Sequence, residues 1–219
     1  IECRIGEGIG KIMQLSGVNN GQQKILASAS YAQNGYYGFR FIPEYEGFYV
    51  LGDGKNHEYP LYLKAGDAVS LFMDKDTIYL TGKNNTAENK VLYDWVNLSK
   101  RVCEKSIFST YEDFFPEFEV LLSKIKPFCK NIETKNSRFN ELMKHFISYE
   151  LDRFALNFIY TPRSKHPSKE QRIAYYHSIV DNNKFQDEVI LEMPDGIKLL
   201  KLYMMFYCLE NKKNASDLQ

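Results

Sequence analysis

Hydrophobic and polar residues alternate with a period of two through most of the first 82 residues of the chain. In one such run Tyr37, Phe39 and Phe41 fall on one side of an extended backbone, and Tyr36 and Arg40 fall on the other. This alternation is typical of a strand with one face packed against a core. The full set of predicted strands is 24–31, 35–43, 47–51, 59–64, 68–73 and 77–81, with a further strand expected before residue 20.

The connectors between these runs are short and rich in turn residues, for example Asn20-Gly21, Asp53-Gly54 and Gly66-Asp67. Connectors of this length cannot hold a crossover helix, so neighbouring strands should be antiparallel. Seven or eight strands at this spacing predict a small β-sandwich or a partly open barrel.

After Gly82 the hydrophobic period changes to three and four residues, which indicates amphipathic helices. The predicted helices span residues 86–105, 110–131, 137–160, 168–182 and 195–212, and a further short helical turn is possible within 181–193. Three residue pairs have the spacing of a helix cap and its third residue: Asn85 with Glu88, Ser109 with Glu112, and Ser168 with Gln171.

The distribution of glycine agrees with this division, because all but one of the 13 glycines lie in the first 90 residues and Gly196 is the exception. Glycine suits turns and costs roughly 1 kcal/mol in a helix interior. We therefore predict an α+β protein with an antiparallel β-sandwich or partly open barrel over residues 1–84. A helical domain of about five helices should follow over 85–212, and 213–219 should form a tail or linker.

Charge and hydropathy exclude two classes of partner. The 28 basic and 28 acidic residues cancel, so bulk charge does not attract nucleic acid. The most apolar stretch, residues 197–209, is interrupted by lysines and is shorter than the roughly 20 residues that a membrane-spanning helix needs. We expect no nucleic-acid partner and no transmembrane segment.

No motif in the chain identifies a reaction. The glycines before Lys11 lack the spacing of a phosphate-binding loop, and the four histidines show no metal-ligand spacing. Close carboxylates such as Asp74 and Asp76 lie in turns and are interpreted as solvated charges. We predict no catalytic residue, no cofactor and no metal, although a hydrolase built from residues that meet only in space is a third possibility.

The four cysteines, Cys3, Cys103, Cys129 and Cys208, are widely separated and form no C-x-x-C pair. A Cys103–Cys129 disulfide between neighbouring helices is geometrically conceivable. Isolated cysteines are more often small core residues.

Tyrosine density is the main indication of a binding surface. Tyr36, Tyr45 and Tyr49 lie in or beside the predicted strands, and a sheet that carries tyrosine on its second face could bind a sugar, a peptide or a partner domain. The alternative is that these tyrosines line a sheet covered by the helices.

Residues 59–71 and 77–90, with the boundary Gly82-Lys-Asn-Asn85 and the aromatic pair Tyr93 and Trp95, carry a resemblance to a known family. The pattern resembles the N-terminal region of TlpA- or ResA-like thiol:disulfide oxidoreductases of Bacteroidetes. In that family a β-rich domain and a helical segment precede a thioredoxin domain. The thioredoxin domain and its C-x-x-C are missing from these 219 residues, so the resemblance transfers no catalytic residue.

The resemblance implies a non-catalytic accessory module in the cell envelope, periplasmic or otherwise extracytoplasmic. Its partner would be its own C-terminal thioredoxin-like domain or another protein, and the chain would be the N-terminal part of a longer oxidoreductase or a stand-alone relative. A stand-alone extracytoplasmic binding protein for glycans or peptides is the alternative function.

Overall fold

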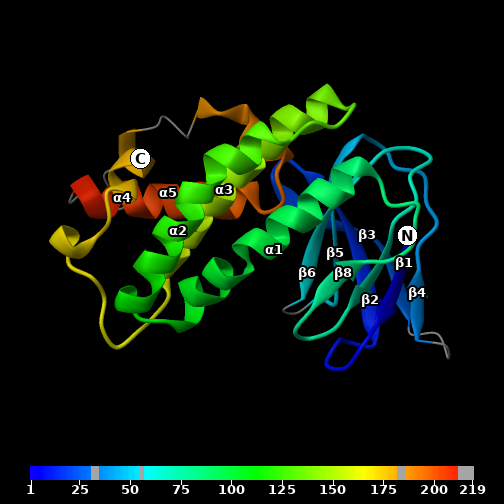
Figure 1. Ribbon diagram of the computed structural model, residues 1–219, viewed down its shortest axis with the longest axis horizontal. Helices are drawn as coiled ribbons and strands as arrows, with labels where there is room; N and C mark the ends of the chain where they lie inside the picture. The colour runs from blue at the N-terminus through cyan, green and yellow to red at the C-terminus, as the bar shows by residue number, and fades with distance from the viewer. Residues whose placement is uncertain (31–34, 55–56, 182–185, 212–219) are drawn as a thin grey trace.

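The computed structural model describes residues 1–30, 35–54, 57–181 and 186–211. Strands gather on one side of the molecule and helices on the other, as Figure 1 shows, so the predicted α+β class is confirmed. The strands are β1 (Glu2–Ile5), β2 (Ile12–Asn19), β3 (Gln22–Ser30), β4 (Tyr36–Gly38), β5 (Gly47–Gly52), β6 (Glu58–Leu63), β7 (Ser70–Met73) and β8 (Ile78–Leu80). The helices are α1 (Ala87–Phe108), α2 (Tyr111–Lys130), α3 (Ser137–Tyr160), α4 (Tyr175–Asp181) and α5 (Gly196–Asn211), with 3₁₀ turns η1 (Lys169–Gln171) and η3 (Glu188–Glu192).

The described strands form two four-stranded sheets that do not close into a barrel. Sheet A has the order β4-β1-β7-β8, and sheet B has the order β3-β2-β5-β6. The pairs joined by short connectors, β2–β3, β5–β6 and β7–β8, are antiparallel as predicted. One pair differs: β1 and β7 are parallel, because all of sheet B lies between them in the sequence and no hairpin constrains their direction.

Strand β5 is buried on both faces, and its alternation divides the core in two. Tyr49 and Leu51 point into the space between the sheets. Phe48 points the opposite way and stacks on Phe146 of α3, with ring centroids 5.0 Å apart. Tyr62 of β6 likewise packs edge-on against Phe139 of α3 at 4.9 Å. Sheet B is therefore the middle layer, between sheet A and the helices.

Helix α1 runs along one open side of the sandwich, beside the edge strands β6 and β8 (Figure 1). Two asparagines near its start, Asn85 and Asn89, hold it there and are called the asparagine clamp below. The Asn85 amide accepts the N–H of Ser70 at 2.9 Å and donates to the Ser70 carbonyl at 3.0 Å. The Asn89 amide does the same to Tyr62, at 3.0 Å and 2.7 Å. One helix start therefore binds both sheets.

Two of the predicted caps are displaced by one residue. The side chain that caps α1 is that of Thr86, which accepts the N–H of Asn89 at 3.2 Å, because the Asn85 amide is engaged with β7. Ser109 ends α1 instead of starting α2, since its hydroxyl donates to the Lys105 carbonyl at 2.7 Å. The third prediction is confirmed, because Ser168 and Gln171 form a capping box at η1.

A second junction joins the β2–β3 turn to the start of α5. The Gly21 N–H donates to the Leu191 carbonyl at 2.6 Å, and the Ile197 N–H donates to the Gly21 carbonyl at 3.0 Å. Gly21 has a φ of +70°, which favours glycine. A Cβ atom on Gly196 would lie 1.9 Å from the Ile190 carbonyl oxygen. Any side chain at this position would clash with the Ile190 carbonyl, which explains the presence of a glycine in the helical region.

The helices match the predicted segments except for the fourth. Residues 168–182 were predicted as one helix, but the structure has η1, an extended residue at Arg172 and then the short α4. At this break the Arg172 guanidinium contacts the Glu210 carboxylate of α5 at 2.6 Å. The short turn anticipated within 181–193 corresponds to η3.

A buried carboxylate connects the last helices to α3. Asp152 is 1% exposed and accepts hydrogen bonds from the hydroxyl of Tyr175 in α4, at 2.7 Å, and from that of Tyr203 in α5. A buried carboxylate requires such donors. Asp152 thus fixes where α4 and α5 pack.

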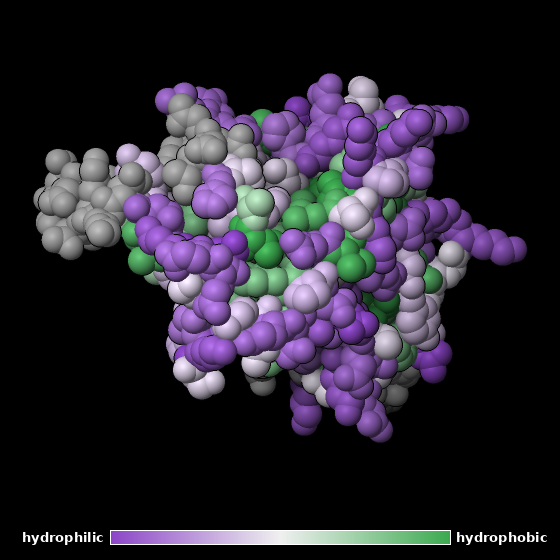
Figure 2. Space-filling model, turned by 60° about the vertical axis from the view of Figure 1, so that its left-hand side comes forward, coloured by the Kyte–Doolittle hydropathy of each residue, from purple (hydrophilic) through white to green (hydrophobic). Residues whose placement is uncertain are grey.

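Apolar side chains reach the surface in the middle of the face shown in Figure 2, surrounded by hydrophilic ones.

Among the described helices, none combines the length and the apolar character that a bilayer crossing requires. The predicted tail, 213–219, lies outside the described residues.

Candidate functional site

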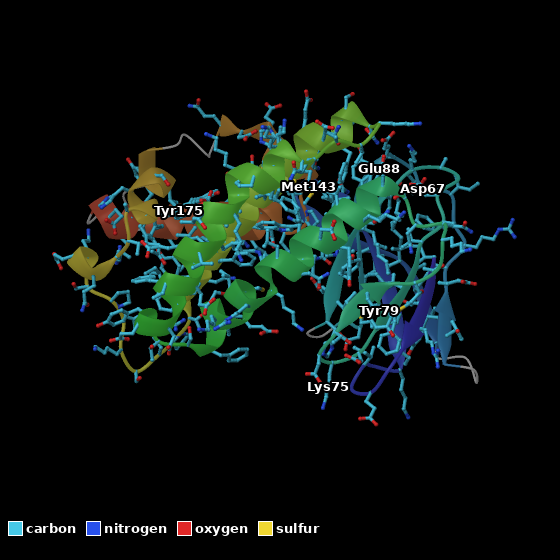
Figure 3. All side chains as sticks on the ribbon, in the orientation of Figure 1. Asp67, Lys75, Tyr79, Glu88, Met143 and Tyr175 are labelled. Carbon is cyan, nitrogen blue, oxygen red and sulfur yellow. The ribbon has the colours of Figure 1, made fainter. Side chains whose placement is uncertain are left out.

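A cleft of about 340 Å³ opens where α1 diverges from the sandwich, and we call it the hairpin cleft. Its walls are the β7–β8 turn over residues 74–79, the start of β6, and the side of α1 that carries Tyr93 and Asn97. Figure 3 labels Lys75 near the tip of the β7–β8 hairpin and Tyr79 on β8, both below α1 in that view. The cleft therefore lies between the two structural regions of the protein.

His57 lines the hairpin cleft with an imidazole oriented by Asp53. His57 Nδ1 lies 2.9 Å from Asp53 Oδ2, and the Asp53 side chain is only 2% exposed whereas that of His57 is 26% exposed. An ionised carboxylate only accepts hydrogen bonds, so the proton of this contact belongs to Nδ1. The other ring nitrogen, Nε2, is then the one available to a molecule in the cleft.

A buried aspartate that orients a histidine is one part of a nucleophilic triad, but a triad also needs a nucleophile. The cleft-lining residues that the structure describes include no serine or cysteine. The Thr77 hydroxyl, the only one from serine or threonine among them, donates to Asp74 at 3.0 Å. The Asp53–His57 pair therefore closes the β5–β6 connection and presents a polar ring to the cleft.

The β7–β8 turn is stiffened by its own charged groups. Asp74 Oδ1 accepts the N–H groups of Asp76 at 2.8 Å and Thr77 at 2.6 Å, and these bonds hold the pKa of Asp74 below its usual value. The Lys100 ammonium of α1 donates to the Asp76 carbonyl, and Lys75 lies 3.9 Å from the Asp76 carboxylate. The hairpin wall of the cleft is thus fixed both internally and to α1.

The structure does not bring the three tyrosines of the sequence analysis onto one surface. Tyr49 is fully buried between the sheets, and Tyr36 is 41% exposed on the outer face of sheet A. Tyr45 is half-buried and stacks on Tyr49 with ring centroids 4.8 Å apart. Its hydroxyl accepts the Val18 N–H at 2.5 Å and donates to the Phe48 carbonyl at 2.9 Å. Tyr45 and Tyr49 thus stabilise a corner of the sandwich.

Sheet A carries a row of side chains on its outer face that sequence reasoning missed. Tyr36, Arg4, Phe72 and Tyr79 occupy paired positions on the four adjacent strands, and we call them the sheet A row. Arg4 lies over the Tyr36 ring at 6.0 Å, and Phe72 stacks on Tyr79 at 4.8 Å. The alternation within β7 and β8 marks Phe72 and Tyr79 as outward-facing, but their alignment with Arg4 depends on the parallel pairing.

A second hollow, of about 430 Å³, lies where β6, α1, α3 and the start of α5 meet. Glu150 and Arg153 form a two-point ion pair in its wall, with nitrogen–oxygen distances of 2.8 and 2.6 Å. Cys103 lies beside them, and burial raises the pKa of its thiol although Arg153 opposes this effect. A thiol with a raised pKa is a poor nucleophile.

Two of the remaining thiols, those of Cys3 and Cys129, agree with this pattern. All four cysteines are free, so the conceivable Cys103–Cys129 disulfide is not formed. Burial raises the pKa of Cys3 to about 12 and also raises the pKa of Cys129. The side chains of the described residues bring no three His, Cys, Asp or Glu groups together in an arrangement that could hold a metal ion.

A function can therefore be argued from three features: the polar hairpin cleft, the aromatic sheet A row and the four free thiols. Comparison of the chain with protein-family models, with curated proteins and with solved structures finds no match.

Proposed function

We propose that this chain is a non-catalytic, extracytoplasmic module that positions a thioredoxin-like redox domain or docks the proteins on which that domain acts. The order of parts, a β-rich region followed by a helical one, supports the proposal through the family resemblance described above. The protonation of the buried thiols supports the part of the proposal that the chain is non-catalytic. Thiol–disulfide exchange needs an accessible thiolate, and burial raises the pKa of Cys3, Cys103 and Cys129.

The two junctions between sandwich and helices support a positioning role. The asparagine clamp and the Gly21–Gly196 contact lie at separate places and join the two regions through backbone groups. Side chains from sheet B also enter the helical core. Two separate junctions fix the sandwich relative to the helices, so the surfaces of the two regions keep a constant position relative to each other. A docking module requires such a fixed arrangement.

Insulin-disulfide reduction tests this function. The chain alone should reduce insulin no faster than buffer with dithiothreitol, and clear turnover would contradict the non-catalytic role. Added to a thioredoxin-like enzyme, the chain should lower the KM for a protein disulfide by about threefold or more and leave the rate with a small aromatic disulfide unchanged. Equal kinetics with both substrates, with and without the chain, would exclude docking.

A second candidate function is binding of glycans or peptides, and the sheet A row favours it. Aromatic and arginine side chains are enriched where proteins bind partners, and here they align across four strands on an exposed face. Glycan-array or calorimetric binding that disappears in Tyr36→Ala would support this function. Tyr49 is unsuitable for that test, because replacing a fully buried side chain disturbs the fold.

A further inference from the structure

We propose that the hairpin cleft is a binding site for a neutral saccharide of one or two sugar rings. This inference is independent of the docking function, to which no particular surface is assigned. It has a ligand class in common with the second candidate function but assigns the ligand to a different site, which shares only Tyr79 with the sheet A row.

Two tyrosines supply flat apolar surfaces in the cleft. Tyr79 enters it from β8 and Tyr93 from α1. The Tyr79 side chain is held by its stack on Phe72, with the ring planes inclined by 22°, and yet Tyr79 is 43% exposed. The C–H faces of a pyranose ring pack well on such aromatic faces, and tyrosine adds a hydroxyl that can bond to the sugar.

Hydrogen-bonding groups surround these rings. The amide of Asn97 and the ammonium of Lys100 come from α1, and the imidazole of His57 comes from the opposite wall. Asn97 both donates and accepts. His57 Nδ1 is engaged with Asp53, so the ring presents Nε2 to the cleft. Together with the Lys100 ammonium, these groups can match the hydroxyl groups of a sugar, which both donate and accept. The Asp53 carboxylate fixes the His57 ring, so little side-chain freedom remains to be lost at that position when a ligand binds.

The charges of the cleft select against a strongly charged ligand. Three carboxylates and two ammonium groups line it: Glu58, Asp74, Asp76, Lys75 and Lys100. Several of them already bond to one another or to the hairpin backbone. Three negative and two positive groups sum to a net charge of only −1, so a strongly charged ligand finds a weak field. An uncharged ligand with many hydroxyl groups meets donors and acceptors of both kinds.

The size and rigidity of the site agree with this ligand class. Small-molecule sites have volumes of roughly 300–1,000 Å³, and the hairpin cleft has about 340 Å³. One wall is stiffened by the Asp74 turn and the other is anchored by the asparagine clamp. The cleft is consequently formed before a ligand arrives.

Isothermal titration calorimetry with cellobiose, maltose and lactose tests the proposal, with glucuronate and glucosamine as charged controls. At least one neutral disaccharide should bind with a Kd of about 1 mM or below, and more tightly than either charged sugar. Tyr93→Ala and Asn97→Ala should weaken that binding by about tenfold or more. Asn97 is exposed, so its variant keeps the fold, and circular dichroism checks the Tyr93 variant.

Tyr36→Ala is the matched control, because Tyr36 belongs to the sheet A row but not to the cleft. Its binding should equal that of the unmodified chain. Loss of binding in Tyr36→Ala with full binding in Asn97→Ala would place the sugar on the sheet face and overturn the cleft site. Absence of any heat from the three disaccharides at about 10 mM would overturn it as well. Neither result affects the docking function, which the insulin assay tests separately.

Discussion

Replacing Asn89 with alanine removes the amide that occupies the open edge of β6. Among the described strands β6 pairs only with β5, so none of them partners the backbone groups of Tyr62 on its other side. Asn89 serves as that partner, accepting from the Tyr62 N–H at 3.0 Å and donating to the Tyr62 carbonyl at 2.7 Å. Asn89 is fully buried, so water does not take its place in the folded protein. The Asn89→Ala variant leaves both backbone groups without a partner.

The expected loss follows from these two bonds. Each buried donor or acceptor left unsatisfied costs about 1–3 kcal/mol. Alanine recovers roughly 0.5 kcal/mol, because it is a better helix former than asparagine. The free energy of unfolding should therefore fall by about 1.5–5.5 kcal/mol, a large part of the roughly 5–15 kcal/mol that stabilises a typical domain.

Urea denaturation followed by the fluorescence of Trp95, the single tryptophan, measures this loss. With a urea slope of about 2 kcal/mol per M, the midpoint should fall by about 1–3 M for Asn89→Ala. Asn84→Ala is the control, because Asn84 is exposed on the same segment and its removal should change the free energy by no more than about 0.5 kcal/mol. The Tyr62 amide hydrogen should exchange with solvent faster in the Asn89→Ala variant than in the unmodified chain. Equal midpoints for the two variants, with the Tyr62 amide still protected, would refute the clamp.

Three further predictions test other contacts. Gly196→Ala should destabilise the protein by about 3 kcal/mol or more, since its Cβ would lie 1.9 Å from a backbone carbonyl oxygen. Gly38→Ala is the control, because a Cβ atom there meets nothing within 4 Å. Equal melting temperatures for the two variants would contradict this prediction. Asp152→Ala removes the buried carboxylate that accepts from the hydroxyls of Tyr175 and Tyr203. It should lower the free energy of unfolding by about 2–4 kcal/mol in a thermal melt, and a loss below about 1 kcal/mol would count against that network. The pKa of Glu112 is lowered to about 2, first by its own backbone N–H and then by Lys165. Because the folded-state pKa is depressed, this carboxylate stabilises the fold above its ordinary pKa of 4.5, and the effect disappears as the pH falls through about 2. An NMR titration of Lys165→Met should show the pKa of Glu112 shifted upward, and an unchanged value would exclude the lysine as a cause.

The secondary structure could be predicted from the chain because it depends on local periodicity. Alternation identified a strand at Tyr37, but β4 spans only Tyr36–Gly38 of the predicted 35–43. The change of period after Gly82 located the start of the helices to within a few residues. The capping pair Ser168 and Gln171 was correct because both of its partners lie within one turn. Asn85 was misassigned as a cap because a contact with Ser70, fifteen residues away, uses its amide instead.

The candidate site could not be predicted in the same way. The pattern places Tyr36 and Tyr49 on strand faces, but it does not tell which face the second sheet covers, so one tyrosine is exposed and the other is buried. The Asp53–His57 contact spans four residues and was within reach of sequence reasoning. That His57 shares a cleft with Tyr93 depends on where α1 packs.

By itself, the sequence determined the order of strands and helices, the turns between them and the absence of a recognisable reactive motif, because all three depend on neighbouring residues. Only the tertiary structure decided that β1 and β7 pair in parallel, that one helix start holds both sheets, and that a cleft opens beside it. Hydrophobic periodicity specifies which side of an element must be buried. It leaves open which partner buries it, and the surfaces that remain exposed follow from that choice.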